Sequence, residues 1–398
     1  VGLEAEGDLL EPFGGSAVEA IRSLQKGSVL AVQGPPGTGK TRLAAEALAA
    51  LMRDGKRVAV AAPGHATIAH CLATALDKID CDVLCVKVGS RRRASADDPE
   101  TALAQRSNVI TKPRWDAKLA KELDTELPVL LGATAWALAR DDAVGTFDYL
   151  FVDEAGQVPA ANLAAMASCA SRIVLLGDQA QLPAPCRGAH DEGGASSCLE
   201  HYVGGEELSE DRGVFLGVTY RLHPLLCGAI SELMYNGKLQ AHDTAAKRVL
   251  SEGTGLLRAR AGLAIVDVAD DGSYRSSTSN QKEAAVVASV VAELLERRLE
   301  DGSSSRSLST DDILVVCPYN AHVRAVEAAL VERGIRRVRV GTVDRFQGRE
   351  APVVVASLCA PPSQNDEDED SVASGGRGVA FVLDVRRLNV ALSRAQCL

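Results

Sequence analysis

The phosphate-binding pattern G-x-x-x-x-G-K-[ST] is matched at every fixed position by Gly34-Pro35-Pro36-Gly37-Thr38-Gly39-Lys40-Thr41. An apolar run over residues 29–32 precedes this loop and an Ala- and Leu-rich stretch over 42–53 follows it, which predicts the strand and helix that the loop needs. The glycines would let backbone N–H groups face a polyphosphate, while Lys40 reaches the outer phosphates and the Thr41 hydroxyl ligates Mg²⁺. A chance Gly-rich turn would not bring both flanking elements with it. The sequence therefore predicts a nucleoside triphosphate site.

Two further polar segments follow apolar strands and complete this chemistry. Asp153 and Glu154 come directly after the apolar run 149–152. We expect Asp153 to be the Mg²⁺ carboxylate and Glu154 to be the general base toward water. Adjacent acids are also favoured at a helix N-terminus, but the upstream loop and the preceding strand favour the catalytic interpretation. Gln181 follows another apolar strand, and strand ends of a parallel sheet gather at one edge, so we expect it to sense the γ-phosphate.

Length and composition restrict the class of protein that carries these residues. The chain has 398 residues, a formal net charge of −10, 46% hydrophobic and 24% charged residues, as expected for a globular protein of two domains. No apolar run is long enough to cross a bilayer and the first residues do not resemble a signal peptide, so we expect a cytoplasmic protein with no membrane partner. The negative charge argues against a surface coated with nucleic-acid-binding cations, but it allows a basic groove.

Apolar strand candidates alternate with helical stretches, which predicts an α/β fold of parallel sheets with helices on both faces. Strands are expected at 29–33, 58–62, 129–133, 149–152 and 173–176, and then at 263–268, 313–317, 338–340 and 353–358. Helices are expected at 282–299 and 321–333, and a loop at 301–309. The long polar segment 87–127 predicts a small inserted subdomain. Domain 1 should cover residues 1–205 and domain 2 residues 206–398, and only the first has a phosphate loop.

Five further segments carry a resemblance to one family. They are DEAGQ at 153–157, GDQAQL at 177–182, YRLHP at 220–224, GTVDRFQGRE at 341–350 and RLNVALSRA at 387–395. In this order they resemble the superfamily 1B (Upf-like) DNA and RNA helicases, from about residue 18 to the end of the chain. GATAW at 132–136 and DRGVFL at 211–216 are most similar to the helicase part of bacterial RecB-family nuclease–helicase fusion proteins.

The resemblance implies two tandem RecA-like P-loop NTPase domains with ATP and Mg²⁺ between them. Arg221 and Arg394 lie at family positions that bring positive charge to the γ-phosphate, an effect worth roughly 10³ to 10⁵ in rate. The alternative for each is an ordinary surface arginine on a helix. Tyr220 and Glu350 match positions that contact adenine and ribose, and Gln347 is grouped with these nucleotide-binding residues.

The resemblance also implies contacts to a nucleic-acid strand. The matching positions are Pro63, His65, Thr67, Thr134, Trp136 and Thr342. Two departures from the family pattern stand out. Ala17 occupies the place of a glutamine that reads adenine, so strict adenine selectivity is not expected. The family continues beyond its last motif with another strand and helices, so domain 2 is expected to be truncated at its C-terminus.

The leading hypothesis is an ATP-driven helicase or translocase on single-stranded nucleic acid. DNA is the preferred partner and 5′-to-3′ the direction, both from the resemblance, with a nuclease domain expected elsewhere in a longer chain. An ATP-gated clamp and an RNA helicase are the alternatives, and phosphate contacts do not distinguish DNA from RNA. The full hydrolytic set favours a motor over a clamp, and a small-molecule kinase would leave the second half unexplained.

Overall fold

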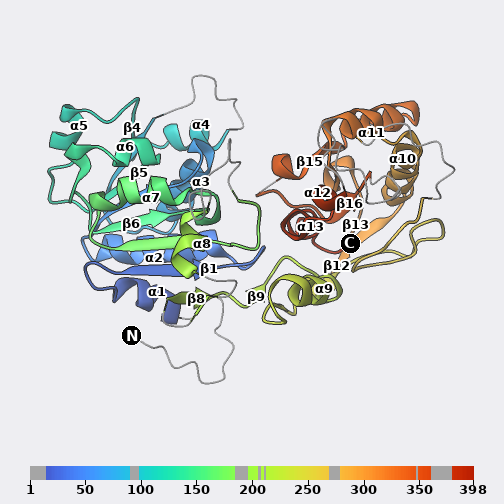
Figure 1. The fold of residues 1–398 in the computed structure, drawn as a ribbon, viewed down its shortest axis with the longest axis horizontal. Helices are drawn as coiled ribbons and strands as arrows, with labels where there is room; N and C mark the ends of the chain where they lie inside the picture. The colour runs from blue at the N-terminus through green and yellow to red at the C-terminus, as the bar shows by residue number, and fades with distance from the viewer. Residues whose placement is uncertain are drawn as a thin grey trace, which may run out of the picture. The chain divides into compact units, whose positions relative to one another are not determined.

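Two compact units make up the chain in the computed structural model, which describes residues 15–89, 98–183, 196–204, 208–209, 212–268, 278–346, 348–359 and 379–398 (Figure 1). The first unit comprises Val1–Gln179 and Pro183–Gly217, and the second comprises Ala180–Leu182 and Val218–Leu398. The division at Gly217 falls after the predicted boundary at residue 205, because residues 213–215 pair with the sheet of the first unit. Leu182 packs with residues of the second unit instead.

One parallel sheet of eight strands forms the centre of the first unit. Its strands are β1 (Val29–Gln33), β2 (Arg57–Ala61), β3 (Leu84–Val88), β4 (Val109–Lys112), β5 (Val129–Ala133), β6 (Tyr149–Val152), β7 (Ile173–Gly177) and β8 (Gly213–Phe215), in the spatial order β4-β3-β5-β2-β6-β7-β1-β8. Every neighbouring pair is parallel. The five strands predicted in this half are confirmed to within one residue at each end, and β3, β4 and β8 are additional.

Helices cover both faces of this sheet, as predicted (Figure 1). Val58 and Val60 of β2 belong to the core on one face, and Ala59 and Ala61 belong to the core on the other, as the two-residue period of a strand requires. Residues of α1 (Gly15–Arg22), α2 (Lys40–Arg53), α3 (His65–Leu76) and α4 (Pro99–Ala104) pack in the first core. Residues of α5 (Ala117–Glu122), α6 (Ala135–Leu138), α7 (Ala160–Met166) and α8 (Cys198–Val203) pack in the second.

The segment 87–127, predicted as an inserted subdomain, continues the main sheet over the part that the structure describes. β4 pairs in parallel with β3 at the edge of the sheet, and α4 and α5 pack on opposite faces. An edge strand is paired on one side only, and Ile110 in β4 is 41% exposed. The polar composition of this segment therefore reflects its place at the sheet edge.

The second unit has a three-stranded parallel sheet, β15-β14-β16, made of β14 (Ile313–Cys317), β15 (Arg339–Thr342) and β16 (Val353–Ala356). One face of β14 packs with α10 (Gln281–Leu295) and α11 (Asn320–Glu332). Leu314 and Val316 point to the other face, where they pack with residues of α13 (Val385–Leu392). Four further elements of the second unit adjoin candidate residues. They are α9 (Pro224–Met234), α12 (Val379–Val382) and the short parallel pair β9 (Val218–Thr219) and β10 (Gln240–Ala241).

Three predictions in the second unit are wrong. Residues 263–268 form no strand in the described part of the chain; Leu263 and Ile265 are exposed, whereas Ala264 and Val266 are partly buried against the core. The helix predicted to end at residue 299 ends at Leu295. β12 (Arg298–Asp301) follows it and forms an antiparallel sheet with β11 (Arg248–Leu250) and β13 (Ser304–Ser307). The predicted loop at 301–309 is therefore mainly a β-hairpin, held because Leu299 is buried in the core.

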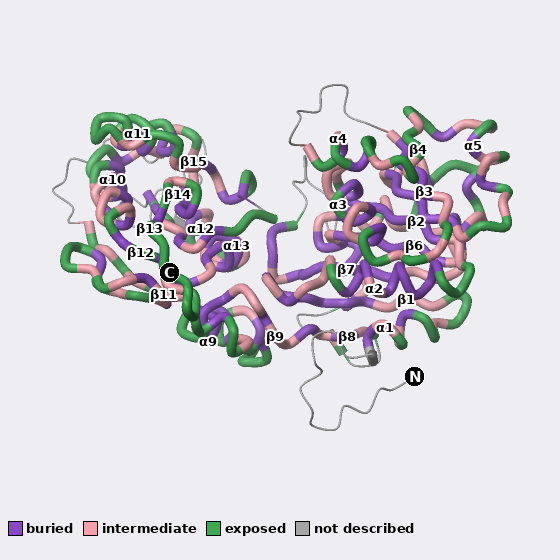
Figure 2. Tube along the Cα trace, turned by 180° about the vertical axis from the view of Figure 1, so that it is seen from behind, coloured by how far each residue is buried: buried purple, intermediate pink, exposed green. Residues whose placement is uncertain are grey.

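The inner strands of the first sheet are mostly buried, as Figure 2 shows, whereas the edge strand β4 is partly exposed. The described helices are short or polar, and none has the length and apolar character of a membrane span.

Candidate nucleotide and nucleic-acid sites

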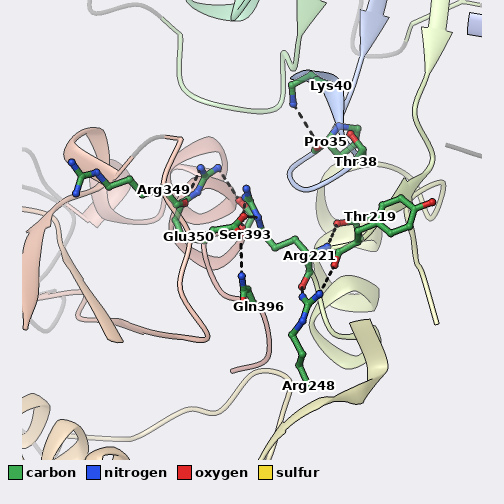
Figure 3. Close-up of polar contacts among 12 residues, drawn as sticks. Pro35, Thr38, Lys40, Thr219, Arg221, Arg248, Arg349, Glu350, Ser393 and Gln396 are labelled. Carbon is green, nitrogen blue, oxygen red and sulfur yellow. Dashed lines mark hydrogen bonds and ion pairs between the residues drawn. The ribbon is translucent and has the colours of Figure 1, made fainter. Parts of the chain in front are cut away.

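The phosphate loop runs from the end of β1 to the start of α2, as predicted. Gly37 and Gly39 have φ values of +76° and +83°, in the left-handed region that favours glycine, so the chain can turn tightly into the helix. Lys40 Nζ donates a hydrogen bond to the backbone oxygen of Gly34 and lies 3.5 Å from the oxygen of Pro35. The Thr38 hydroxyl donates to the same Pro35 oxygen over 2.8 Å (Figure 3). The loop thus holds its own lysine through backbone carbonyls.

Asp153 lies at the end of β6 and is only 6% exposed. Burial and then the neighbouring Glu154 raise its pKa to about 7, while Lys40 and the hydrogen bond from the Glu154 N–H act in the opposite direction. Lys40 is therefore close enough for its charge to act on Asp153.

A buried carboxylate of this kind fits a Mg²⁺ ion, because a divalent cation beside it would supply the opposite charge that burial demands. Thr41 and Asp153 would hold the ion, with phosphate and water oxygens as its remaining ligands. In the described part of the chain there is no cluster of three or more His, Cys, Asp or Glu side chains suited to a metal. When bound, the ion would neutralise charge on the phosphates.

Glu154 has a φ of +54°, which is uncommon for a residue other than glycine. Its backbone N–H donates to Asp153 Oδ1 over 3.0 Å, and a 3₁₀ turn, η2 (Ala155–Gln157), begins immediately after it. Gly156 in this turn approaches the end of β7 so closely that a Cβ there would lie 2.9 Å from the backbone oxygen of Asp178. The chain therefore turns away from the strand direction at Glu154, directly beside Asp153.

A pocket of about 240 Å³ opens beside this turn in the first unit. Its lining includes Pro63, Thr134 and Trp136, three of the residues predicted to contact a strand. Trp136 is 81% exposed, so its ring is available for stacking. His65 and Thr67 do not line this pocket. His65 Nδ1 instead lies 3.3 Å from the ammonium of the buried Lys87, which in turn lies 3.4 Å from Glu100.

The second unit joins two residues predicted at the nucleotide. Arg221 Nε donates to Glu350 Oε2 over 2.5 Å, and its Nη1 donates to the backbone oxygen of Ser393 over 3.1 Å (Figure 3). Glu350 also accepts from Gln396 Nε2 over 2.9 Å. Burial tends to raise the pKa of Glu350, but Arg221, Gln396 and Arg248 together hold it below its ordinary value.

Tyr220, predicted to contact adenine, stacks on His242 with ring centroids 4.4 Å apart and planes at 29°. Arg248 donates to the backbone oxygens of Tyr220 and Arg221 over 3.2 and 3.0 Å, which fixes the chain at these two residues. Thr342, the last residue of β15, lies at the carboxyl end of the second sheet.

Arg394 is 2% exposed and is held by the fold. Its Nε donates to the Val390 backbone oxygen over 3.0 Å, and its Nη2 lies 3.4 Å from Oε1 of Gln181. The predicted γ-phosphate sensor and the second predicted arginine are therefore neighbours. Gln347, the remaining predicted nucleotide-binding residue, lies outside the described residues.

A family model described as an AAA domain matches residues 195–398, more than half of the chain, and a second with the same description matches residues 16–197. The chain belongs to the AAA-domain family, as an Upf-like superfamily 1 helicase. Its two units are thus tandem RecA-like domains.

Curated relatives of this helicase include the DNA polymerase alpha-associated DNA helicase A of Schizosaccharomyces pombe, 26% identical over 91% of this chain and 59% of the relative. The DNA-binding protein SMUBP-2 of Rattus norvegicus is 26% identical over 96% of this chain and 42% of the relative. The DNA replication ATP-dependent helicase/nuclease DNA2 of Mus musculus is 27% identical over 92% of this chain and 34% of the relative. An arterivirus helicase bound to DNA has a similar solved structure, with 15% identity, a TM-score of 0.45, and coverage of 92% of this chain and 58% of that one. The helicase chain spans between about a third and three fifths of the length of these curated relatives.

Sequence reasoning missed three contacts in this helicase. Gln157 lines the pocket and also donates to Glu154, His242 stacks on Tyr220, and Asn389 donates to the backbone oxygen of Ala180 over 2.9 Å. Gln157 had a signal, because it stands three residues after Glu154 and ends the segment DEAGQ. His242 had none, since it lies in an unremarkable polar stretch well after Tyr220.

Proposed function

We propose that the chain is the motor of an ATP-driven helicase or translocase on single-stranded nucleic acid, with DNA preferred and 5′-to-3′ travel. The observation that carries the proposal is the grouping of the predicted residues at the carboxyl edge of one sheet. The phosphate loop follows β1, the acidic pair follows β6, and the pocket with Trp136 is formed by residues that follow β2 and β5. A nucleotide and a nucleic-acid strand bound there would lie at the same edge of one sheet, as a motor that couples the two sites requires.

In this proposal each residue has a separate task. Lys40 and Thr38 belong to the loop that would surround the phosphates, and Asp153 would hold Mg²⁺. Glu154 would take the proton from the attacking water. Arg221, Arg394 and Gln181 would bring charge and hydrogen bonds to the γ-phosphate, and Tyr220 and Glu350 would bind the nucleoside.

The partners that we propose are single-stranded DNA, with RNA as the alternative, and a nuclease domain in a longer chain. Support for DNA comes from relatives that are named as DNA helicases or DNA-binding proteins. The cytoplasmic location expected from the sequence stays a prediction.

The test is the ATPase rate with and without a poly-dT oligonucleotide and its RNA equivalent. Lys40→Ala and Glu154→Gln should both abolish turnover, and Glu154→Gln should still bind ATP, because it keeps the loop and loses only the base. Strong stimulation by poly-dT supports the motor and ranks DNA against RNA. A chain whose hydrolysis ignores both nucleic acids would sink the proposal, and stimulation without directional translocation would favour the clamp.

Trp136→Ala tests the strand site directly. Stacking of one base on an aromatic ring contributes roughly 1–3 kcal/mol, so the poly-dT concentration for half-maximal stimulation should rise about 5- to 150-fold. Val144→Ala, at another exposed apolar residue of the same unit (57% exposed), is the control and should leave that concentration unchanged. Equal behaviour of the two variants would contradict the strand-binding role of the pocket.

A further inference from the structure

One side chain belongs both to the candidate strand pocket and to the hydrolytic site. Gln157 lines the 240 Å³ pocket together with Thr134 and Trp136. Its amide nitrogen donates to Glu154 Oε2 over 3.1 Å. A single hydrogen bond within the first unit therefore connects the pocket wall to the proposed general base.

The local backbone explains how one residue can serve both places. Glu154 adopts a left-handed conformation, and the 3₁₀ turn that follows ends at Gln157. The Gln157 N–H donates to the backbone oxygen of Glu154 over 2.8 Å, so the backbone and the side chain bond the same residue. Residues three apart in a 3₁₀ turn lie directly above one another, which brings the amide to the carboxylate. Gly156, the middle residue of the turn, cannot carry a Cβ because of the Asp178 backbone, so this conformation is fixed.

The chemistry of the pair indicates that Gln157 acts on Glu154 and not the reverse. A general base must present one carboxylate oxygen to water in the correct orientation. Because Oε2 of Glu154 is bonded to Gln157, the orientation of the carboxylate depends on where the Gln157 amide lies. Gln157 is half-buried and forms part of the pocket wall, so a nucleotide of the strand that fills the pocket would restrict its side chain.

We infer that Gln157 is a positioning residue that makes the alignment of Glu154 depend on nucleic acid in the pocket. With the pocket filled, the amide is confined to the conformation that bonds Oε2, and Glu154 is held ready for water. With the pocket open to solvent, water competes for the amide and the carboxylate samples other orientations. The inference rests on the proposed function and adds to it a physical route for nucleic-acid-stimulated hydrolysis.

The first test is Gln157→Leu, which keeps the approximate volume and removes the amide. At saturating poly-dT its kcat should fall at least about tenfold, because misplacing a catalytic group by about 1 Å can cost a hundredfold. The KM for ATP should stay within about threefold, and the use of saturating poly-dT removes any effect of the variant on strand binding from this comparison. The matched control is Asn162→Leu, which changes another amide of the same pocket that has no hydrogen bond to Glu154 among the described contacts. It should raise the half-saturating concentration but keep kcat at saturation within about twofold.

The second test separates positioning from a merely structural role and also serves if Gln157→Leu folds poorly. Gln157→Glu keeps the shape of the side chain but replaces the donating amide by a carboxylate that repels Glu154. At saturating poly-dT its kcat should fall at least about tenfold while the KM for ATP stays within about threefold, as for Gln157→Leu. A wild-type kcat in both Gln157 variants would overturn the inference, as would a loss shared equally by Asn162→Leu. Wild-type hydrolysis that ignores poly-dT would instead overturn the proposed function itself, whatever the variants do.

Discussion

Asp153→Asn should stabilise the first unit at pH 8 while it removes the proposed Mg²⁺ ligand. The side chain is 6% exposed, and Asn has nearly the same shape. Its amide oxygen can still accept the hydrogen bond that the Glu154 N–H donates to Asp153 over 3.0 Å. The substitution therefore removes a buried charge and little else.

The size of the effect follows from the pKa of Asp153, which burial and then Glu154 raise from 3.8 to about 7. Because the folded state holds this proton more tightly than the unfolded state, stability is lost as the pH rises from about 3.8 and the full cost is reached above pH 7. At about 1.4 kcal/mol for each pH unit, the full cost is of the order of 4 kcal/mol. Between pH 5 and pH 8 the cost grows by about 2–3 kcal/mol, and Asn pays none of it.

Thermal unfolding without nucleotide, at pH 5 and at pH 8, measures this difference. A domain of this size shifts its Tm by about 2–4 °C for each kcal/mol, so the Tm advantage of Asp153→Asn should be roughly 5–10 °C larger at pH 8 than at pH 5. Adding Mg²⁺ and ATP should raise the Tm of the wild type and leave that of the variant nearly unchanged. The same Tm difference at both pH values would refute the argument from burial.

Three further predictions concern the second unit. Glu350→Gln should change the free energy of unfolding by less than about 1 kcal/mol in calorimetry, because its ion pair with Arg221 is partly exposed. If Glu350 binds ribose, the same variant should raise the KM for ATP severalfold in ATPase titrations. Acidification from pH 7 to pH 5 should destabilise this unit. Burial lowers the pKa of His322, so the unfolded chain binds the proton at a higher pH than the folded chain does. Calorimetry over that pH range would detect the loss of stability. Ser357→Ala should lower the free energy of unfolding by roughly 1–3 kcal/mol in denaturant titrations. The Ser357 hydroxyl lies 2.7 Å from His322 and donates to Glu283 over 2.5 Å, so its loss leaves both groups with one partner fewer. An unchanged free energy of unfolding would contradict a continuous hydrogen-bond network.

The strands were predictable where each is an unbroken apolar run that a parallel sheet buries on both faces. β1, β5 and β6 are of this kind, and their predicted and observed bounds agree. β3 was missed because Lys87 interrupts it. That lysine is 3% exposed and lies 3.4 Å from the Glu100 carboxylate, a pairing across 13 residues that periodicity does not reveal. β4 was missed because an edge strand keeps polar residues.

The placement of the first-unit candidate residues at strand ends was predictable, since the tips of parallel strands meet at one edge, whereas the role of each residue stays a prediction. The partners of the candidate residues were not predictable. Arg221 and Glu350 are 129 positions apart, and each was assigned to the nucleotide for its own motif. Their direct ion pair depends on how α13 and the end of the second sheet pack, which no spacing in the sequence encodes. The contact between Gln157 and Glu154 was within reach, because it depends only on a local turn of three residues.

The cations expected to meet the phosphates share one property, which is that each is already bonded to an oxygen of the protein. Lys40 donates to the Gly34 backbone oxygen, Arg221 to Glu350 and Ser393, and Arg394 to the Val390 backbone oxygen. A bound nucleotide would have to replace these partners. Each contact therefore contributes only the difference in interaction free energy between the phosphate oxygen and the protein oxygen that it replaces. The exchange differs among the three cations. Lys40 and Arg394 would leave neutral carbonyl oxygens, whereas Arg221 would leave a carboxylate. The exchange should therefore be least favourable for Arg221, because a contact with phosphate would have to compensate for the loss of a charge-assisted hydrogen bond to Glu350.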